Sequence, residues 1–476
     1  MDGLDRLVPH RAVSYILPSI PTGEMVPTIY HAFLISFVFF YYSTEQYYLN
    51  RSLTQTEWDI LQSYTRRIRT IHRFDDRGLN AKSFEILSNP PTTEPLFPNL
   101  QYLRCRYTQE TMPLLRQPLP SLIDLKVLIP VRTSRLLLDS FKSFPMFSPD
   151  IKNIFIEGKY ERMVSIEPDY LCRWQNLCAV YCPGVALDMV ALEHLSRMPA
   201  LTRLDFASSA TLAASESPLL FSHLQDLTLH SKESLNSISW SLSQIRLPGI
   251  TTFGAIIINC PSKQELSSFL TSLLTSNFGH TIETLELHQQ CWGTQIVSVQ
   301  TPLGFEDLRP CMSFSNLRKI ALRICCSVDL TDANVLTLAS AWPKLECLSI
   351  NQEQGWGSQG GITPDGLARL LQTCPLLTLI VVCLDPRGYT QVTPSHAPES
   401  LRLAARSTLM IDVLDAAIEA NSVLAIASFF AGIATCCDKH ISLISWECTM
   451  MDVTNSDEYD GRWDTVRGRI AHLLEL

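Results

Sequence analysis

Apolar residues recur in one short phrase along most of the chain. An aromatic residue or a proline precedes the pattern L-x-x-L-x-apolar, as in "FPNLQYLRC" around Leu100 and "WPKLECLSI" around Leu345. Alternation of apolar and polar positions over such a short stretch is typical of a β-strand with one buried face. The phrase therefore predicts a series of strands, anchored at Leu100, Leu122, Ile151, Leu177, Leu201, Leu224, Ile250, Ile282, Leu317, Leu345 and Leu377.

The spacers between the phrases have a different period. In residues 186–198, 262–276, 330–342 and 363–374, apolar residues recur every three or four positions, which predicts helices with one buried stripe. Thr331 or Asp332, and Thr363 followed by Pro364, are expected to begin two of these helices. Where a proline opens the next phrase, it stops the helix, because its ring cannot continue the hydrogen-bond ladder.

The alternation of strand and helix is a repeat. Successive anchors are 22 to 35 residues apart, with a mean of about 28, which falls in the range of leucine-rich repeats with some longer units. One strand and one helix cannot bury their own apolar faces, so neighbouring units must stack. We therefore predict an α/β leucine-rich-repeat-like solenoid of irregular repeats, with a curved parallel sheet inside and helices outside.

The repeat also sets the expected domain organisation. Weaker copies of the phrase occur at Ile71, Leu401 and Ile441. The solenoid is expected to span residues 53–476, with a C-terminal cap from about residue 440. Residues 1–52 are expected to form a separate, apolar N-terminal segment.

Residues between the apolar anchors should point out of the sheet onto its concave face. This face would be basic at its N-terminal end, more acidic in the middle and basic again near Lys319. Solenoids bind partners on such surfaces. The candidate partner-binding residues are Tyr102, Arg104, Arg106, Lys126, Arg203, Asp205, Asp226, His230, Glu286, His288, Lys319 and Arg323, with Asp124, Ser349 and Asn351 in equivalent positions. At Leu379 and Val381 even the outward positions are apolar, so either a later segment or a partner is expected to cover them.

A glycine-rich stretch raises the alternative of nucleotide binding. Gly355, Gly357 and Gly360 have the spacing G-x-G-x-x-G between an expected strand and an expected helix. However, the pattern does not directly follow the strand that ends at Ile350, and the helix begins only at Thr363. A pyrophosphate would not reach the helix N-terminus, where backbone N–H groups attract anions. We interpret the stretch as an insertion within one repeat.

Composition narrows the partners. The chain of 476 residues has 38 basic and 47 acidic residues and a net charge of −9, so it lacks the basic field that binds nucleic acid. The apolar run from Ala32 to Tyr42 is shorter than the roughly 20 residues that span a bilayer. We expect no nucleic-acid partner and interpret the run as a buried helix or strand. A membrane-associated segment is the alternative.

No residue pattern indicates catalysis, a metal or a cofactor. The 15 cysteines form no C-x-x-C motif and are expected to be reduced thiols of a cytoplasmic or nuclear protein. His223 with His230, and His280 with His288, are spaced along expected strands and are interpreted as surface or loop histidines. The acidic residues between Asp452 and Asp464 are interpreted as a solvated cap. We expect a non-enzymatic protein with no cofactor.

Several stretches resemble a known family. "LTQTEWDILQSYTRRIRTI" from Leu53, "FPNL" from Phe97, "ITPDGLARLLQTCPLL" from Ile362 and the ending from Tyr459 are similar to the F-box and leucine-rich-repeat-like proteins of mushroom-forming fungi. The resemblance covers roughly residues 53–476. It implies a substrate-recognition subunit of a cullin-RING (SCF-type) ubiquitin ligase, in which an F-box holds the adaptor and cullin and the solenoid holds the target.

The N-terminal segment departs from that family. An F-box is about 45 residues of three short helices, and residues 1–52 show no such pattern, so no adaptor-binding residue can be assigned. The chain is either a relative without an F-box or one whose first exon is not the natural one. The alternative function is a repeat-based scaffold or interaction protein without ligase contacts.

Overall fold

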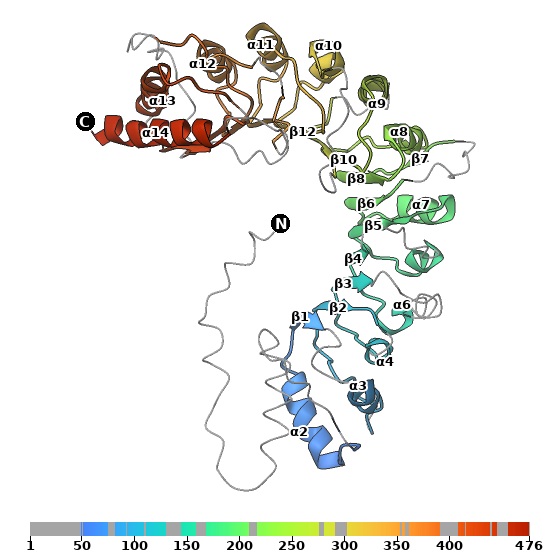
Figure 1. Cartoon of the computed structure of the whole chain (residues 1–476). Helices are drawn as coiled ribbons and strands as arrows, with labels where there is room; N and C mark the ends of the chain where they lie inside the picture. Colours follow the sequence, from blue (N-terminus) through green and yellow to red (C-terminus); the bar gives the residue numbers. More distant parts are fainter. Residues whose placement is uncertain are drawn as a thin grey trace.

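The described part of the chain forms one curved solenoid. The computed structural model describes residue 49 and residues 51–74, 81–91, 93–108, 111–129, 144–158, 168–208, 217–275, 280–290, 302–352, 355–357, 361–390, 408–414, 416–437, 440–444 and 456–475. In these residues the strands line the inside of an arc and the helices line its outside (Figure 1). This arrangement confirms the predicted α/β leucine-rich-repeat-like solenoid.

Fourteen strands of the described residues form a single parallel sheet in chain order. They are β1 (Thr70–Phe74), β2 (Tyr102–Arg106), β3 (Asp124–Ile129), β4 (Asn153–Gly158), β5 (Ala179–Ala186), β6 (Arg203–Ala207), β8 (Asp226–Ser231), β10 (Thr252–Ile257), β11 (Thr284–Gln289), β12 (Lys319–Arg323), β13 (Cys347–Ile350), β14 (Leu379–Val381), β15 (Thr408–Asp412) and β16 (His440–Ile444). A second, two-stranded sheet joins β7 (Leu219–Leu220) to β9 (Ile245–Arg246).

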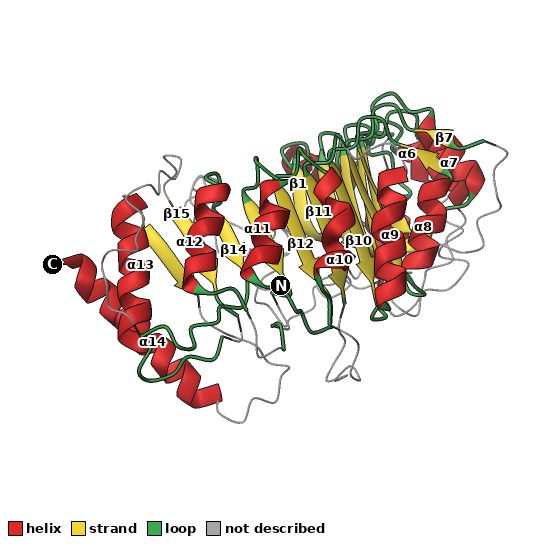
Figure 2. Ribbon diagram, turned by 90° about the horizontal axis from the view of Figure 1, so that it is seen from above, coloured by secondary structure: helices red, strands yellow, loops and turns green. Residues whose placement is uncertain are grey.

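Helices cover the outer face of the large sheet and lie side by side along it (Figure 2). They are α2 (Gln55–Thr65), α3 (Ala81–Ser88), α4 (Met112–Leu115), α6 (Phe144–Phe147), the 3₁₀ helix η1 (Pro168–Arg173), α7 (Met189–Ser196), α8 (Leu235–Ser243), α9 (Lys263–Thr275), α10 (Phe305–Leu308), the 3₁₀ helix η2 (Arg309–Ser313), α11 (Asp332–Ser340), α12 (Pro364–Thr373), α13 (Val423–Cys437) and α14 (Ser456–Glu475).

The apolar anchors form a continuous spine. Leu100, Leu201 and Leu345 are buried, as are the other eight predicted anchors. Three residues beyond each anchor, a second apolar residue points the same way, and the register aligns these from Leu103 to Ile411 across the sheet. Burying such a side chain contributes about 1.5–3 kcal/mol, so the stacked anchors supply the main stabilisation of the solenoid.

Local hydrogen bonds fix the starts of the outer helices. Thr331 is the N-cap of α11 and its hydroxyl accepts from the backbone N–H of Asn334; Thr363 is the N-cap of α12, with Pro364 at the first helical position. These two predictions are confirmed, with Thr331 and not Asp332 at the first N-cap. Each cap satisfies an N–H that has no partner within its own helix.

The first turn of α11 also clamps the next helix. The Asp332 carboxylate accepts from both the backbone N–H (2.8 Å) and the hydroxyl (2.6 Å) of Thr363. A Cβ atom on Gly366 would lie only 2.0 Å from Oδ1 of Asp332. The close approach of the two repeats therefore needs a glycine at this position.

Buried tryptophans add polar links between repeats. The Nε1–H of Trp174 donates to the carbonyl of Ser148, and that of Trp342 donates to the carbonyl of Cys311. Both side chains are fully buried, and both reach the preceding repeat. Each indole thus fills core volume and satisfies its single donor, which is the usual requirement for a buried tryptophan.

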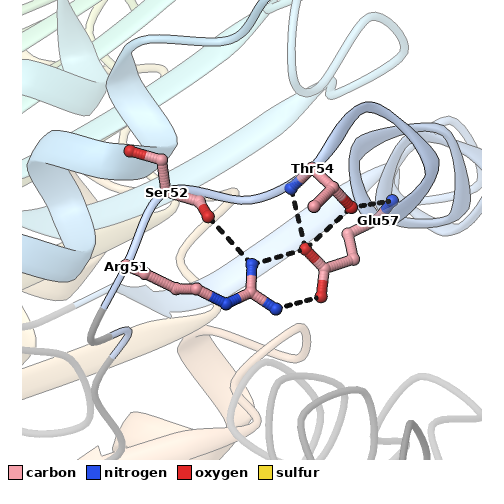
Figure 3. Close-up of polar contacts among 4 residues, drawn as sticks. All are labelled: Arg51, Ser52, Thr54 and Glu57. Carbon is pink, nitrogen blue, oxygen red and sulfur yellow. Dashed lines mark hydrogen bonds and ion pairs between the residues drawn. The ribbon is translucent and has the colours of Figure 1, made fainter.

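A charged capping box begins the N-terminal helix α2 (Figure 3). The N-cap hydroxyl of Thr54 accepts from the backbone N–H of Glu57, and the Glu57 carboxylate accepts from the backbone N–H of Thr54. Arg51 donates to both oxygens of Glu57, each at 2.8 Å. The hydrogen bond from Arg51, followed by that from the Thr54 backbone, lowers the pKa of Glu57 to about 2.

We expect the stability of the N-terminal end to fall at acid pH. Because the pKa of Glu57 is lower in the folded chain than its ordinary value of 4.5, its stabilising effect is complete above about pH 4.5 and is lost as the pH falls towards 2. Glu57→Gln should reduce the free energy of unfolding by about 1 kcal/mol at pH 7, and this difference should shrink below pH 4.5. Urea unfolding at pH 7, 5 and 3, with hydrogen exchange of residues 53–66, measures it.

Glu94→Gln is the matched control for this prediction. Glu94 forms an ion pair with Arg66, but both side chains are more than half exposed, so its loss should cost less than about 0.5 kcal/mol. A Glu57→Gln difference that stays constant from pH 7 to pH 3 would contradict the role given to the capping carboxylate.

Two long helices close the C-terminal end. α14 packs on α13, and Trp463, Val466 and Ile470 form its buried stripe. The Nε1–H of Trp463 donates to the carbonyl of Ala416 (2.9 Å), and Arg462 donates to that of Ile418 (2.8 Å). α14 therefore lies beside α13 at the C-terminal end of the solenoid (Figure 1).

Some predictions fall outside the described residues or need correction. The N-terminal segment up to Tyr48 with its apolar run, the weak repeat at Leu401, and Gly360 lie outside them. Ten of the described cysteines are free thiols as predicted, but Cys325 is disulfide-bonded, so the expectation of reduced thiols is wrong there. Among the described helices, none combines the length and the apolar character needed to cross a bilayer.

Candidate functional site

The register of the sheet arranges the outward side chains of the concave face in rows. The first row contains the first residue of each strand from β2 to β14 and the residue of β15 in register with them. It consists of Tyr102, Asp124, Asn153, Ala179, Arg203, Asp226, Thr252, Thr284, Lys319, Cys347, Leu379 and Met410. The second row lies two residues further and consists of Arg104, Lys126, Phe155, Tyr181, Asp205, Thr228, Gly254, Glu286, Ala321, Ser349, Val381 and Asp412.

A third, shorter row contains Ala207, His230, Ile256, His288 and Arg323. The three rows bring together the candidate residues of the central strands, and Arg106 lies at the equivalent level on β2. Residues far apart in sequence thus share one surface, because stacked repeats present equivalent positions side by side.

The N-terminal end of the face is basic and aromatic. Arg104 is exposed and Tyr102 is half-buried, with the Tyr102 ring centroid 5.4 Å from that of His72 on β1. Burial raises the pKa of the Tyr102 phenol, an effect that Arg104 opposes. Among the described residues, Arg104 has no ion-pair partner. Lys126, in contrast, pairs with Glu157 on the next strand.

Two aromatic rings stack in the second row, near its N-terminal end. The rings of Phe155 on β4 and Tyr181 on β5 are parallel, with centroids 4.4 Å apart and an interplanar angle of 3°. The ammonium of Lys126 lies 5.9 Å from the Phe155 ring centroid. A hydrogen bond to Tyr181 raises the pKa of the Arg203 guanidinium. Two aromatic rings are therefore flanked by one cation on each side.

Phe155 and Tyr181 were not among the predicted site residues. The same alternation that selected Lys126 and Asp205 also selects these two positions, four residues beyond the anchors Ile151 and Leu177. The sequence signal was present, because both phrases carry an aromatic residue at an outward position. Both rings are only half-buried in the structure.

Carboxylates gather on the central strands. Asp205 and Glu286 lie in the second row and Asp226 in the first. Desolvation raises the pKa of the Asp226 carboxyl; Arg203 opposes this shift, while the negative charges of Asp205 and Glu286 reinforce it. The three carboxylates therefore act on one another across β6, β8 and β11.

The histidine of this region is not a surface residue. His230 is only 7% exposed, and its Nε2 lies 2.9 Å from Oδ1 of Asp205. The interpretation of His230 as a surface or loop histidine is therefore wrong, although it lies on the predicted face. Its neighbour in the third row, His288, is half-buried. The Asp205 contact comes from the neighbouring strand, so the burial of His230 cannot be read from one strand alone.

Small side chains form the floor between Asp205 and Glu286. Thr228 and Gly254 occupy the second row on β8 and β10. A Cβ atom on Gly254 would lie 2.9 Å from the Thr228 hydroxyl oxygen, so the absence of a side chain here permits their close approach. The carboxylates on either side of this floor are consequently not screened by bulky neighbours within the row.

The C-terminal strands differ from the prediction in two places. Ser349 and Asn351 are buried, at 2% and 0% exposure, so they are not part of an accessible face. Asn351 has a positive φ of 58°, and its side chain bonds to the backbone of Ile324 and Cys326. It is a structural residue of the strand end.

Lys319 and Arg323 on β12 are half-buried and lie on the face as predicted. Lys319 forms an ion pair of 2.5 Å with Glu286 on β11. Val381 is fully buried and Leu379 half-buried, so the chain itself covers the outward apolar position of Val381. Beside them, Met410 is 38% exposed.

The glycine-rich stretch has the local geometry of a turn. Gly355 and Gly357 have positive φ values of 73° and 57°, and the Gly355 N–H donates to the Asn351 carbonyl. Trp356 between them is fully buried, and its indole N–H donates to Ile350. The glycines let the chain turn so that this tryptophan can enter the core, which supports the interpretation as an insertion within one repeat.

The candidate site is therefore a broad face and not a catalytic cleft. Within the described residues, no three histidine, cysteine, aspartate or glutamate side chains are grouped as metal ligands. Burial raises the pKa of the Cys105 and Cys311 thiols to about 12, which disfavours their reactive thiolate form. What the face offers is stacked aromatic rings, cations and carboxylates at fixed spacings.

Comparisons with known proteins add only distant structural similarities. No protein-family model and no curated protein sequence matches the chain. Among solved structures it is similar to a chain of the yeast Rad7–Elc1 complex, with 15% identity, a TM-score of 0.34 and coverage of 67% of this chain and 69% of that one.

Two further similarities are of the same kind. One is to TLR13 in a complex with single-stranded RNA, at 12% identity and a TM-score of 0.35 over 78% of this chain and 55% of that one. The other is to an internalin of Listeria monocytogenes, at 14% identity and a TM-score of 0.27 over 68% and 82%. The chain is a leucine-rich-repeat-like protein by its sheet order and register.

Proposed function

We propose that this chain is a non-enzymatic protein-interaction module that binds a target protein on its concave face. The observation that carries the proposal is the aligned surface of three rows, in which the Phe155–Tyr181 stack is flanked by accessible charges. Tyrosine and arginine supply much of the binding energy at protein interfaces, and solenoids bind partners along extended faces. In this proposal the chain needs no cofactor and performs no reaction.

The finer proposal is that the chain is the substrate-recognition subunit of a cullin-RING ubiquitin ligase in the cytoplasm or nucleus. Its support is the resemblance of residues 53–476 to F-box and leucine-rich-repeat-like proteins of fungi. The alternative is a scaffold without ligase contacts, and its motive is that residues 1–52 show no F-box pattern.

One capture experiment tests the general proposal. The full-length tagged chain would be purified from cells beside a concave variant carrying Arg104→Glu, Tyr181→Ala and Glu286→Lys. We expect the variant to recover the target at least tenfold less well, because it loses an aromatic contact and reverses two charges. Quantitative mass spectrometry measures the recovery.

The control variant alters the convex side. Arg197→Glu with Glu193→Arg exchanges an exposed ion pair on α7 and should leave target recovery unchanged. Equal target recovery by wild type and concave variant would overturn concave-face binding.

The ligase proposal has a separate readout in the same samples. The adaptor and cullin should be recovered equally with the wild type and the concave variant, because an F-box contact would not involve the concave face. Their absence from both samples, followed by failure to bind purified adaptor, would overturn the ligase proposal and leave the scaffold.

A further inference from the structure

The concave face carries charges of opposite sign on either side of its aromatic stack. On the N-terminal side, Asp124 accepts a hydrogen bond from Asn153 and Glu157 pairs with Lys126, whereas the exposed Arg104 has no ion-pair partner among the described residues. The side towards β2 therefore presents an uncompensated positive charge.

On the other side, negative charge is in excess. Strands β6 to β11 contribute Asp205, Asp226 and Glu286 to the first two rows against Arg203 alone. Lys319 forms an ion pair with Glu286, Asp205 contacts His230, and the Arg203 guanidinium interacts with Tyr181. Asp226 is thus the carboxylate best placed to receive a cation from a partner.

The surface between these charges fits an apolar side chain. Ala179 lies in the first row on the same strand as Tyr181 and is buried, so it places no bulky side chain beside the half-buried rings of Phe155 and Tyr181. An apolar residue beside such rings loses water-exposed area and gains aromatic contacts. The stack can therefore anchor the middle of a segment whose ends meet the charges.

The spacing of the strands sets the spacing of the partner's residues. β4 is two strands from β2, and β5 is two strands from β8. With about 4.8 Å between neighbouring strands, each interval is about 10 Å. An extended chain covers this distance in about three residues at roughly 3.3 Å per residue.

We propose that the partner presents a linear segment across β2 to β8, with an apolar residue at the Phe155–Tyr181 stack, an acidic residue about three positions to one side at Arg104, and a basic residue about three positions to the other at Asp226. This inference rests on the proposed function and specifies the chemistry of its partner. Burial is the main cause of the raised pKa of Asp226, and the negative charges of Asp205 and Glu286 add to it; a cation bound there would favour the ionised carboxylate and offset that repulsion.

The test uses random twelve-residue peptides displayed on phage and selected against the immobilised full chain, with removal of clones that also bind the Phe155→Ala/Tyr181→Ala variant. We expect enriched peptides to carry an acidic and a basic residue on opposite sides of an apolar one. The affinity of a synthesised member, measured by fluorescence anisotropy, should fall at least tenfold for Tyr181→Ala and at least fivefold for Arg104→Glu and for Asp226→Lys.

Charge exchange provides the sharpest readout. A peptide in which glutamate replaces the basic residue should no longer bind the wild type but should bind Asp226→Lys. The convex control Arg197→Glu should bind the original peptide as tightly as the wild type does. Equal thermal unfolding of wild type and variants establishes that the face is intact. Tyr181→Leu, which removes the stacked ring but keeps an apolar side chain of moderate size, replaces Tyr181→Ala if the latter unfolds.

Three outcomes would overturn the inference: no enriched peptide, enriched peptides whose charges are of one sign, or affinities unaffected by the charge variants. Displacement of the peptide by a single-stranded oligonucleotide would also overturn it, because it would identify a polyanion site. If the captured target still depends on the concave face while no peptide is enriched, only the linear segment is disproved and the proposed function stands.

Discussion

Replacement of Asn351 by leucine is expected to lower the free energy of unfolding by about 4 kcal/mol. Its Oδ1 accepts from the backbone N–H of Ile324 at 3.0 Å, and its Nδ2 donates to the carbonyl of Cys326 at 2.7 Å. Leucine would leave both buried backbone groups without these partners, at about 1–3 kcal/mol each. It would also place a branched side chain at a φ of 58°, which costs a further 1–2 kcal/mol or so.

Asn351→Gly separates the two causes. Glycine tolerates the positive φ but cannot make the side-chain hydrogen bonds, so we expect about half the loss seen with leucine. Urea unfolding followed by circular dichroism measures both variants. Hydrogen exchange should locate the loss in β12 and β13, because each repeat contacts mainly its neighbours. A loss below about 1 kcal/mol for Asn351→Leu would contradict this account.

Asn351 also shows where sequence reasoning on the concave face fails. Alternation along a strand places it outward, in line with Ser349. The strand ends at Ile350, however, and the left-handed backbone at Asn351 turns its side chain towards the preceding repeat. The period of two holds only while the backbone stays extended, so an outward assignment one residue beyond a strand is not supported by the pattern.

The spine of the solenoid could be predicted because it depends on local pattern. The strands at Leu100, Leu201 and Leu345 follow from the repeated phrase, and even the weak copies at Ile71 and Ile441 lie in β1 and β16. The two-residue strands β7 and β9 could not be predicted, because so short a segment has no periodicity.

The candidate site was predicted as a face but not as a set of contacts. The alternation placed Arg104 and Asp226 correctly, because outward direction is a property of one strand. The stacking of Phe155 on Tyr181 and the burial of His230 depend on the register and curvature of neighbouring strands. Those quantities arise only when repeats of unequal length are packed together.

Replacement of Trp463 by alanine is expected to release the C-terminal helix α14. Trp463 is fully buried against the end of the solenoid, and its indole N–H donates to the Ala416 carbonyl. Truncating such a side chain costs about 3–5 kcal/mol, which exceeds what Val466 and Ile470 can offset in a single docked helix. Hydrogen exchange of residues 456–475 should lose protection, and binding of a hydrophobic dye should increase.

Two further variants identify the source of that effect. Trp463→Phe keeps most of the apolar contact and loses only the hydrogen bond to Ala416, so we expect a cost of about 1–2 kcal/mol with α14 still docked. Arg467→Ala removes a half-exposed partner of Asp464 on the same helix and should change little.

Full protection of α14 in Trp463→Ala would show that Val466, Ile470 and the Arg462 bond to Ile418 suffice to hold the cap. Loss of protection spreading beyond α13 into the central strands would instead show that the cap stabilises the solenoid as a whole, since terminal units of repeat proteins shield the apolar face of the last repeat.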